Sequence, residues 1–110
     1  MTKPIDPQAC LRRMWERAPK LAQARGNLAF VEKFRESLKA QIMRSSDAPS
    51  IAAKEIEALS HADYIAHIKG LEAATEEYER LRWEMVIDQA AVDVWRTQEA
   101  SNRGMDRGTQ

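Results

Sequence analysis

The chain has 110 residues, of which 44% are hydrophobic and 31% charged, and its formal net charge is zero. This length suits a single domain of residues 1–110, and no run of 18 apolar residues is present, so a membrane-spanning helix is not expected. The single Cys10 excludes an internal disulfide and a cysteine-rich zinc site. The first residues contain no apolar signal core, which predicts a cytoplasmic protein.

The charge is unevenly distributed along the chain. Residues 1–45 hold ten Lys or Arg against four Asp or Glu, a balance of +6, whereas residues 46–110 hold seven against thirteen, a balance of −6. One interpretation is that basic N-terminal helices pack against an acidic C-terminal helix, within or between subunits. The other is a basic face that binds nucleic acid. The first is favoured, because the acidic half would repel phosphates unless it faced away.

The first helix is predicted over residues 7–25, after a loose end at residues 1–5. Asp6 is placed to cap this helix, and Pro7 suits its first position, where the missing N–H is no loss. Apolar residues then recur at steps of three and four, which is the helical period. They are Leu11, Met14, Trp15, Ala18, Leu21 and Ala22.

Two features predict interruptions after this start. Pro19 lies inside the helical pattern and is expected to kink or split the helix. Gly26 suits the positive φ of a helix end, and Asn27 suits the cap of a new helix. A second helix is therefore predicted over residues 28–44.

The middle of the chain is predicted to form a core, a loop and a short helix. Phe30 and Phe34 are four residues apart, so they share a helix face and are expected to anchor the core. The small polar residues 45–50 predict a loop. The short helix predicted over residues 51–59 has little more than two turns, so it must dock on another element to be stable.

The longest predicted element is one helix over residues 61–102. At 1.5 Å per residue it would measure roughly 60 Å, whereas a compact protein of this size is only about 35 Å across. Gly70 costs about 1 kcal/mol inside a helix, so a bend is expected there if anywhere. A heptad seam runs along this helix. Its members are Tyr64, His67, Leu71, Ala74, Tyr78, Leu81, Met85, Asp88, Val92, Trp95 and Glu99.

The sequence also suggests where the long helix begins and ends. Ser60 and Asp63 form a start signal, in which the hydroxyl and the carboxylate satisfy free N–H groups of the first turn. Asn102 and Gly104 supply the stop. Residues 104–110 are then expected to form a second loose end.

A second apolar strip flanks the seam. Its members are Ile65, Ile68, Trp83, Val86, Ile87, Ala90, Ala91 and Val94. From Leu81 onward the apolar surface is too wide for a two-stranded seam, and it indicates a helical bundle in which each helix touches two neighbours. We expect a homodimer with antiparallel long helices, with a tetramer as the alternative. The predicted oligomer interface is Tyr78, Leu81, Met85, Asp88, Val92 and Trp95.

Asp88 is the polar exception within the seam. A buried carboxylate is costly unless it is paired, so a seam position predicts an arginine partner and a role in fixing which helices pair. Arg12, Arg13 and Arg17 of the basic helix are the candidate partners. The alternative is that the seam ends at Met85 and that Asp88 is exposed.

No catalytic, cofactor or metal site is predicted. On a straight helix His61 and His67 point in different directions, so they are not expected to bind one metal ion. A Gly-rich phosphate loop and a nucleophile motif are both missing from the sequence. If the chain binds nucleic acid, the candidate phosphate contacts are Arg12, Arg13, Arg17, Lys20 and Arg25.

The run EEYERLRWEMVIDQAAVDVWRTQEASNR, with FVEKFRESLKAQIM upstream, resembles small, uncharacterised all-helical proteins of tailed phages and prophages. Genes for such proteins often lie near replication and recombination genes. The resemblance implies a bacterial host cytoplasm and a context of phage DNA metabolism. It carries no catalytic motif, so it transfers no site to this chain.

Two hypotheses for function follow. The first is a non-enzymatic, oligomeric helical protein that acts through protein–protein interaction, with itself as one partner and a further protein unidentified. It is motivated by the long helix, the wide apolar surface and the missing catalytic motifs. The alternative is a DNA-binding accessory factor in phage recombination or replication that uses the basic N-terminal helices.

Overall fold

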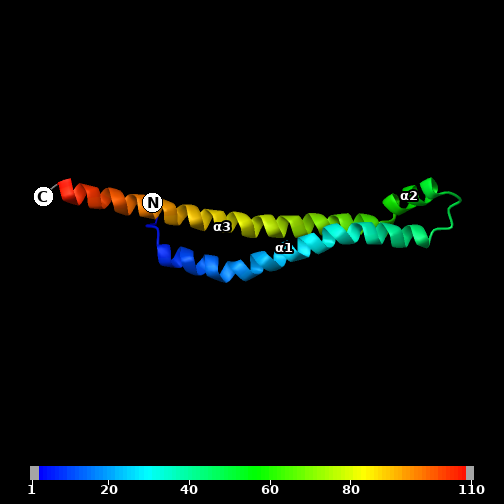
Figure 1. Cartoon of the computed structure of the whole chain (residues 1–110), viewed down its shortest axis with the longest axis horizontal. Helices are drawn as coiled ribbons and strands as arrows, with labels where there is room; N and C mark the ends of the chain where they lie inside the picture. The colour runs from blue at the N-terminus through cyan, green and yellow to red at the C-terminus, as the bar shows by residue number, and fades with distance from the viewer. Residues whose placement is uncertain (1–2, 109–110) are drawn as a thin grey trace. The chain divides into compact units, whose positions relative to one another are not determined.

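The computed structural model describes residues 3–108, and its regular structure there consists of three α-helices without a strand (Figure 1). Helix α1 spans Pro7–Arg44, α2 spans Ile51–Ser60 and α3 spans Ala62–Gly108. The predicted all-α fold with a long C-terminal helix is confirmed. The outermost parts of the two predicted loose ends, residues 1–2 and 109–110, lie outside the described residues.

Helix α1 begins as its sequence predicts. The Asp6 carboxylate accepts hydrogen bonds from the backbone N–H groups of Gln8 (3.0 Å) and Ala9 (3.2 Å), and Pro7 takes the first helical position. These bonds satisfy donors that have no partner inside the helix. The predicted start of the first helix is therefore confirmed.

The predicted break around Gly26 is wrong, because α1 continues through this residue to Arg44. Gly26 does not adopt the positive φ of a helix end. Ala24 and Leu28, on either side of it, are both buried, and their packing outweighs the cost of about 1 kcal/mol for glycine in a helix. Pro19 likewise lies inside the helix and does not split it.

The predicted loop and short helix are confirmed at residues 45–50 and in α2. Ser50 caps α2, since its hydroxyl accepts a hydrogen bond from the Ala53 N–H at 3.1 Å. The loop is held by Ser46, whose hydroxyl accepts from the Ala48 N–H at 3.1 Å and bonds to the Glu57 carboxylate.

The cap of α3 differs from the prediction. His61 precedes the helix, and its Nδ1 accepts a hydrogen bond from the Asp63 N–H at 3.0 Å. The Ser60 hydroxyl instead donates to the Ile56 carbonyl at 2.8 Å, inside α2. Ser60 belongs to the preceding helix, so the predicted pairing of Ser60 with Asp63 is wrong.

The predicted stop at Asn102 and Gly104 is also wrong, because α3 continues to Gly108. Gly104 keeps a helical φ, and Arg107 in the last turn interacts favourably with the negative end of the helix dipole. All residues from 96 to 108 are exposed. This last part of α3 is therefore helical without packing against another element.

The described chain divides into two compact units, and each of the long helices α1 and α3 contributes residues to both units. We call residues 3–21 and 80–108 the terminal unit, and residues 22–79 the middle unit. The prediction of a single domain, made from length, stays a prediction. None of the helices in the described range combines the length and the apolar character needed to cross a membrane.

In the middle unit the core is small. Its buried residues are Ala24, Leu28, Ala58, Tyr64 and Ala74. The His67 ring Nε2–H donates to the Val31 carbonyl at 2.8 Å, and the ring lies 5.8 Å from that of Phe34. Phe30 stacks on Phe34 at 5.7 Å but is 66% exposed. The expectation that both phenylalanines anchor the core is therefore wrong for Phe30.

Gly26→Ala should stabilise the protein. A Cβ added at Gly26 meets nothing within 4 Å and the residue is helical, so the change reduces the entropy of the unfolded chain by about 0.5–1 kcal/mol without strain. Urea unfolding followed by circular dichroism measures the gain. A loss of stability in this variant would mean that Gly26 ends a helix after all.

Candidate functional site

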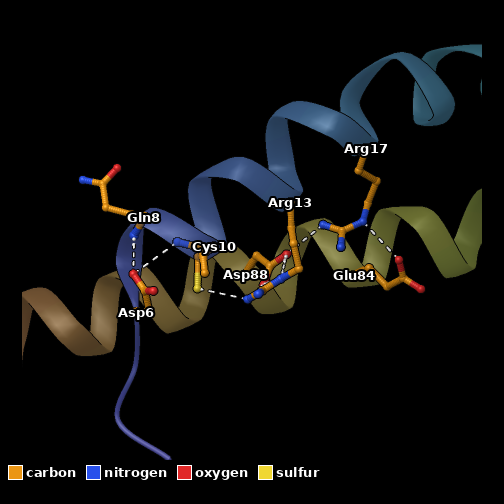
Figure 2. A network of polar contacts seen from close by, with 8 residues as sticks. Asp6, Gln8, Cys10, Arg13, Arg17, Glu84 and Asp88 are labelled. Atoms are coloured by element: carbon orange, nitrogen blue, oxygen red, sulfur yellow. Dashed lines mark hydrogen bonds and ion pairs between the residues drawn. The ribbon is translucent and has the colours of Figure 1, made fainter.

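The terminal unit contains one buried charge, Asp88 on α3, which is only 5% exposed. Arg13 and Arg17 of α1 both bond to it: Arg13 Nη2 lies 2.8 Å from Oδ1, and Arg17 Nη1 lies 2.8 Å from Oδ2 (Figure 2). The predicted burial of Asp88 with arginine partners from the basic helix is confirmed. The third candidate partner, Arg12, is exposed.

Further bonds extend this contact into a network. Arg17 Nε donates to Glu84 at 3.0 Å, and Arg80 Nη1 donates to the other oxygen of Glu84 at 2.8 Å. On its other side, Arg13 Nη2 donates to the Cys10 sulfur at 3.3 Å (Figure 2). The residues Arg13, Arg17, Arg80, Glu84 and Asp88 are called the ion cluster below.

The sequence brings these groups together by helical spacing. Cys10, Arg13 and Arg17 are separated by three and four residues, so they share one face of α1. Glu84 and Asp88 are four residues apart and share one face of α3. The earlier arginine, Arg13, pairs with the later carboxylate, Asp88, whereas Arg17 also reaches Glu84. Helices α1 and α3 are therefore antiparallel in the terminal unit.

The ion cluster keeps Asp88 ionised. The hydrogen bond from Arg13 lowers the pKa of Asp88 more than burial raises it, and the bond from Arg17 lowers it further. The same contact with Asp88 raises the pKa of Arg13. Among the described residues, every buried side-chain nitrogen or oxygen has a hydrogen-bond partner. Such a fully paired site holds two helices in register.

The predicted interface residues lie mostly on the face of α3 that carries Asp88. Within the terminal unit Leu81 is buried, and Met85, Val92 and Trp95 are half-buried in the single chain. Leu81 and Asp88 are therefore covered by the chain itself, with α1 supplying the partners of Asp88. Tyr78 belongs to the middle unit, where it is half-buried. An intermolecular role for this set stays a prediction.

The five candidate phosphate contacts do not form one group. Arg13 and Arg17 direct their guanidinium groups at carboxylates of α3. Arg12 and Lys20 are exposed. Arg25, in the middle unit, lies over the ring of Tyr78 with its guanidinium carbon 5.5 Å from the ring centre. Two of the five positive charges are thus paired with carboxylates of α3, although Arg13 itself is half exposed, which weakens the case for a phosphate-binding face.

The sequence alone did not reveal which apolar face of α3 stays uncovered. We call Trp83, Val86, Ile87, Ala90 and Val94 the outer strip. Each residue turns a helix by about 100°, which places this strip opposite the face of Asp88. Its large side chains are exposed: Trp83 by 54%, Val86 by 43%, Ile87 by 63% and Val94 by 49%.

The described residues form no metal site, and comparison with known proteins does not indicate a function. Across residues 3–108, no group of three or more His, Cys, Asp or Glu side chains is placed to hold a metal ion. No family model, curated protein or solved structure matches the chain. The ion cluster and the outer strip are therefore the two features of the terminal unit that bear on function.

Asp88→Asn should destabilise the protein by about 2 kcal/mol at pH 7, because the charged hydrogen bonds to two arginines are lost. The folded-state pKa of Asp88 is lowered. Its stabilising effect is thus present above the ordinary pKa near 3.9 and disappears as the pH falls through the folded-state pKa. Urea unfolding from pH 7 to pH 3 measures the difference.

The matched control is Glu99→Gln, which changes an exposed carboxylate of the same helix and should alter stability by less than about 0.5 kcal/mol. The free energies of unfolding of the wild type and of Asp88→Asn should converge on acidification. A gap that stayed constant down to pH 3 would show that the charge of Asp88 is not what stabilises the fold.

Proposed function

We propose that the chain is a non-enzymatic helical protein that acts by binding protein, with a second copy of itself as its first partner. The observation that carries this proposal is the exposed outer strip on α3, opposite the face that α1 covers. A helix that is apolar on two faces is typical of bundles, in which it touches two neighbours. In the terminal unit, α3 has one neighbour from its own chain.

The exposed area of the chain supports the same proposal. The chain exposes 8554 Å², whereas a folded monomer of 12.6 kDa is expected to expose about 6200 Å². Stable dimers bury about 800 Å² per partner. The excess is larger than the area that one partner of a stable dimer buries, so the chain has surface that a second copy could cover.

The charged groups support binding rather than catalysis. The ion cluster consists of carboxylates paired with guanidinium groups, an arrangement that orders helices and leaves no base or nucleophile poised for reaction. The engagement of Arg13 and Arg17 also makes DNA binding the weaker alternative. A bacterial host and a phage context, suggested by the sequence resemblance, belong to this proposal as its setting.

Light scattering after size exclusion tests the proposal. We expect the mass at tens of micromolar to be twice the 12.6 kDa of one chain and to fall towards that of one chain on dilution. Because apolar contacts depend little on sodium chloride, the mass should be nearly the same at about 0.1 M and 0.5 M salt. A mass of one chain up to several hundred micromolar would contradict the proposal.

A further inference from the structure

We propose that the outer strip of α3 binds the outer strip of a second copy, with the two α3 helices antiparallel. This inference rests on the proposed self-association and adds the surface and the orientation to it. The occupant is a second copy, and not another protein, because the strip is complementary to itself when it is turned by a two-fold rotation.

The spacing of the strip suits a helix partner. Trp83, Ile87, Ala90 and Val94 follow at steps of four, three and four, which is the heptad pattern of a helix–helix seam. Val86 widens the strip on one side. On the opposite seam Leu81 and Asp88 are buried within the chain, whereas the large side chains of this second seam are exposed and open to another helix.

Side-chain sizes favour the antiparallel orientation. A two-fold axis between residues 88 and 89 places Trp83 against Val94 of the second copy and Ile87 against Ala90. Large residues then meet smaller ones along the contact, as in well-packed interfaces. In a parallel pair Trp83 would meet Trp83 and Ala90 would meet Ala90, which leaves one end crowded and the centre hollow.

Charge favours the same orientation. Arg82 and Asp93 flank one edge of the strip on the same side of the helix. The Arg82 guanidinium carbon lies 4.9 Å from the centre of the Trp83 ring. The Asp93 side chain is 57% exposed, although its carboxylate accepts from Gln89 at 3.3 Å and lies 3.9 Å from Arg96 Nη1. In the antiparallel pair Arg82 lies within one helical turn of Asp93 of the second copy, twice by symmetry. In a parallel pair this edge would face the opposite edge of the second copy, and Arg82 would not meet Asp93.

The size of the strip sets the expected affinity. Twelve residues of helix span about 17 Å, and the exposed parts of four large side chains amount to a few hundred Å² per copy. This lies at the low end for specific protein interfaces. We therefore expect a dissociation constant on the order of micromolar and a dimer that dissociates on dilution.

Two matched substitutions test the surface. Trp83→Glu places a charge in the outer strip, whereas Trp15→Glu makes the same change at the most exposed tryptophan, 81% exposed on α1. Ile87→Glu is the second strip variant. Both strip variants should weaken the dimer about 100-fold and give the mass of one chain, while Trp15→Glu should keep the wild-type mass. Circular dichroism checks that each variant remains helical.

The outcomes separate this inference from the proposed function. A wild-type dimer that survives both strip variants would overturn the strip as the interface and leave self-association intact. Loss of the dimer in Trp15→Glu as well would also overturn the assignment to α3 alone. A wild type with the mass of one chain at all concentrations would remove the proposed function and this inference together.

The orientation has its own test. A spin label at Ser101→Cys, with Cys10→Ala to remove the native thiol, reports the distance between the two copies by pulsed electron resonance. Ser101 lies about 12 residues from the proposed two-fold axis, so the antiparallel pair predicts a distance of about 40 Å. A distance of about 10–20 Å, as expected for adjacent parallel helices, would overturn the antiparallel arrangement.

Discussion

Two guanidinium groups hold one buried carboxylate in the terminal unit, and the alignment of α1 with α3 there depends on this contact. A shift of α3 by one residue would turn Asp88 by about 100° away from Arg13 and Arg17. Both arginines would then lose their carboxylate partner, and the charged hydrogen bonds that offset the burial of Asp88 would be broken. The ion cluster therefore favours the register in which Arg13 and Arg17 both reach Asp88.

The position of Asp88 also decides which surface of α3 remains open. Because α1 lies on the face that carries Asp88, the outer strip on the opposite face has no neighbour within the terminal unit. The helix thus uses one apolar face to complete its own fold and keeps the other for a partner. The buried charge and the exposed apolar strip are two consequences of a single arrangement, in which α3 has more apolar surface than one chain covers.

Features that depend on local spacing could be predicted from the sequence. They include the all-α class, the cap at Asp6 and the loop at residues 45–50. The arginine partners of Asp88, 71 and 75 residues away, could be predicted because a buried carboxylate needs a charged partner. The continuity of α1 at Gly26 and of α3 at Gly104 could not be predicted, because glycine costs a helix only about 1 kcal/mol and other contributions outweigh it. Periodicity also predicted that the apolar surface of the long helix is wider than one seam. Which face α1 covers depends on tertiary packing, and no spacing rule states it.

A double-mutant cycle between Arg17 and Asp88 tests the central claim most directly. The free energies of unfolding of Arg17→Ala, Asp88→Ala and the double variant are measured at one protein concentration, since association also contributes to stability. We expect a coupling of about 1–2 kcal/mol, whereas the same cycle with the exposed Arg12 should give almost none. A coupling for Arg17 no larger than that for Arg12 would contradict the claim that this ion pair aligns the two helices.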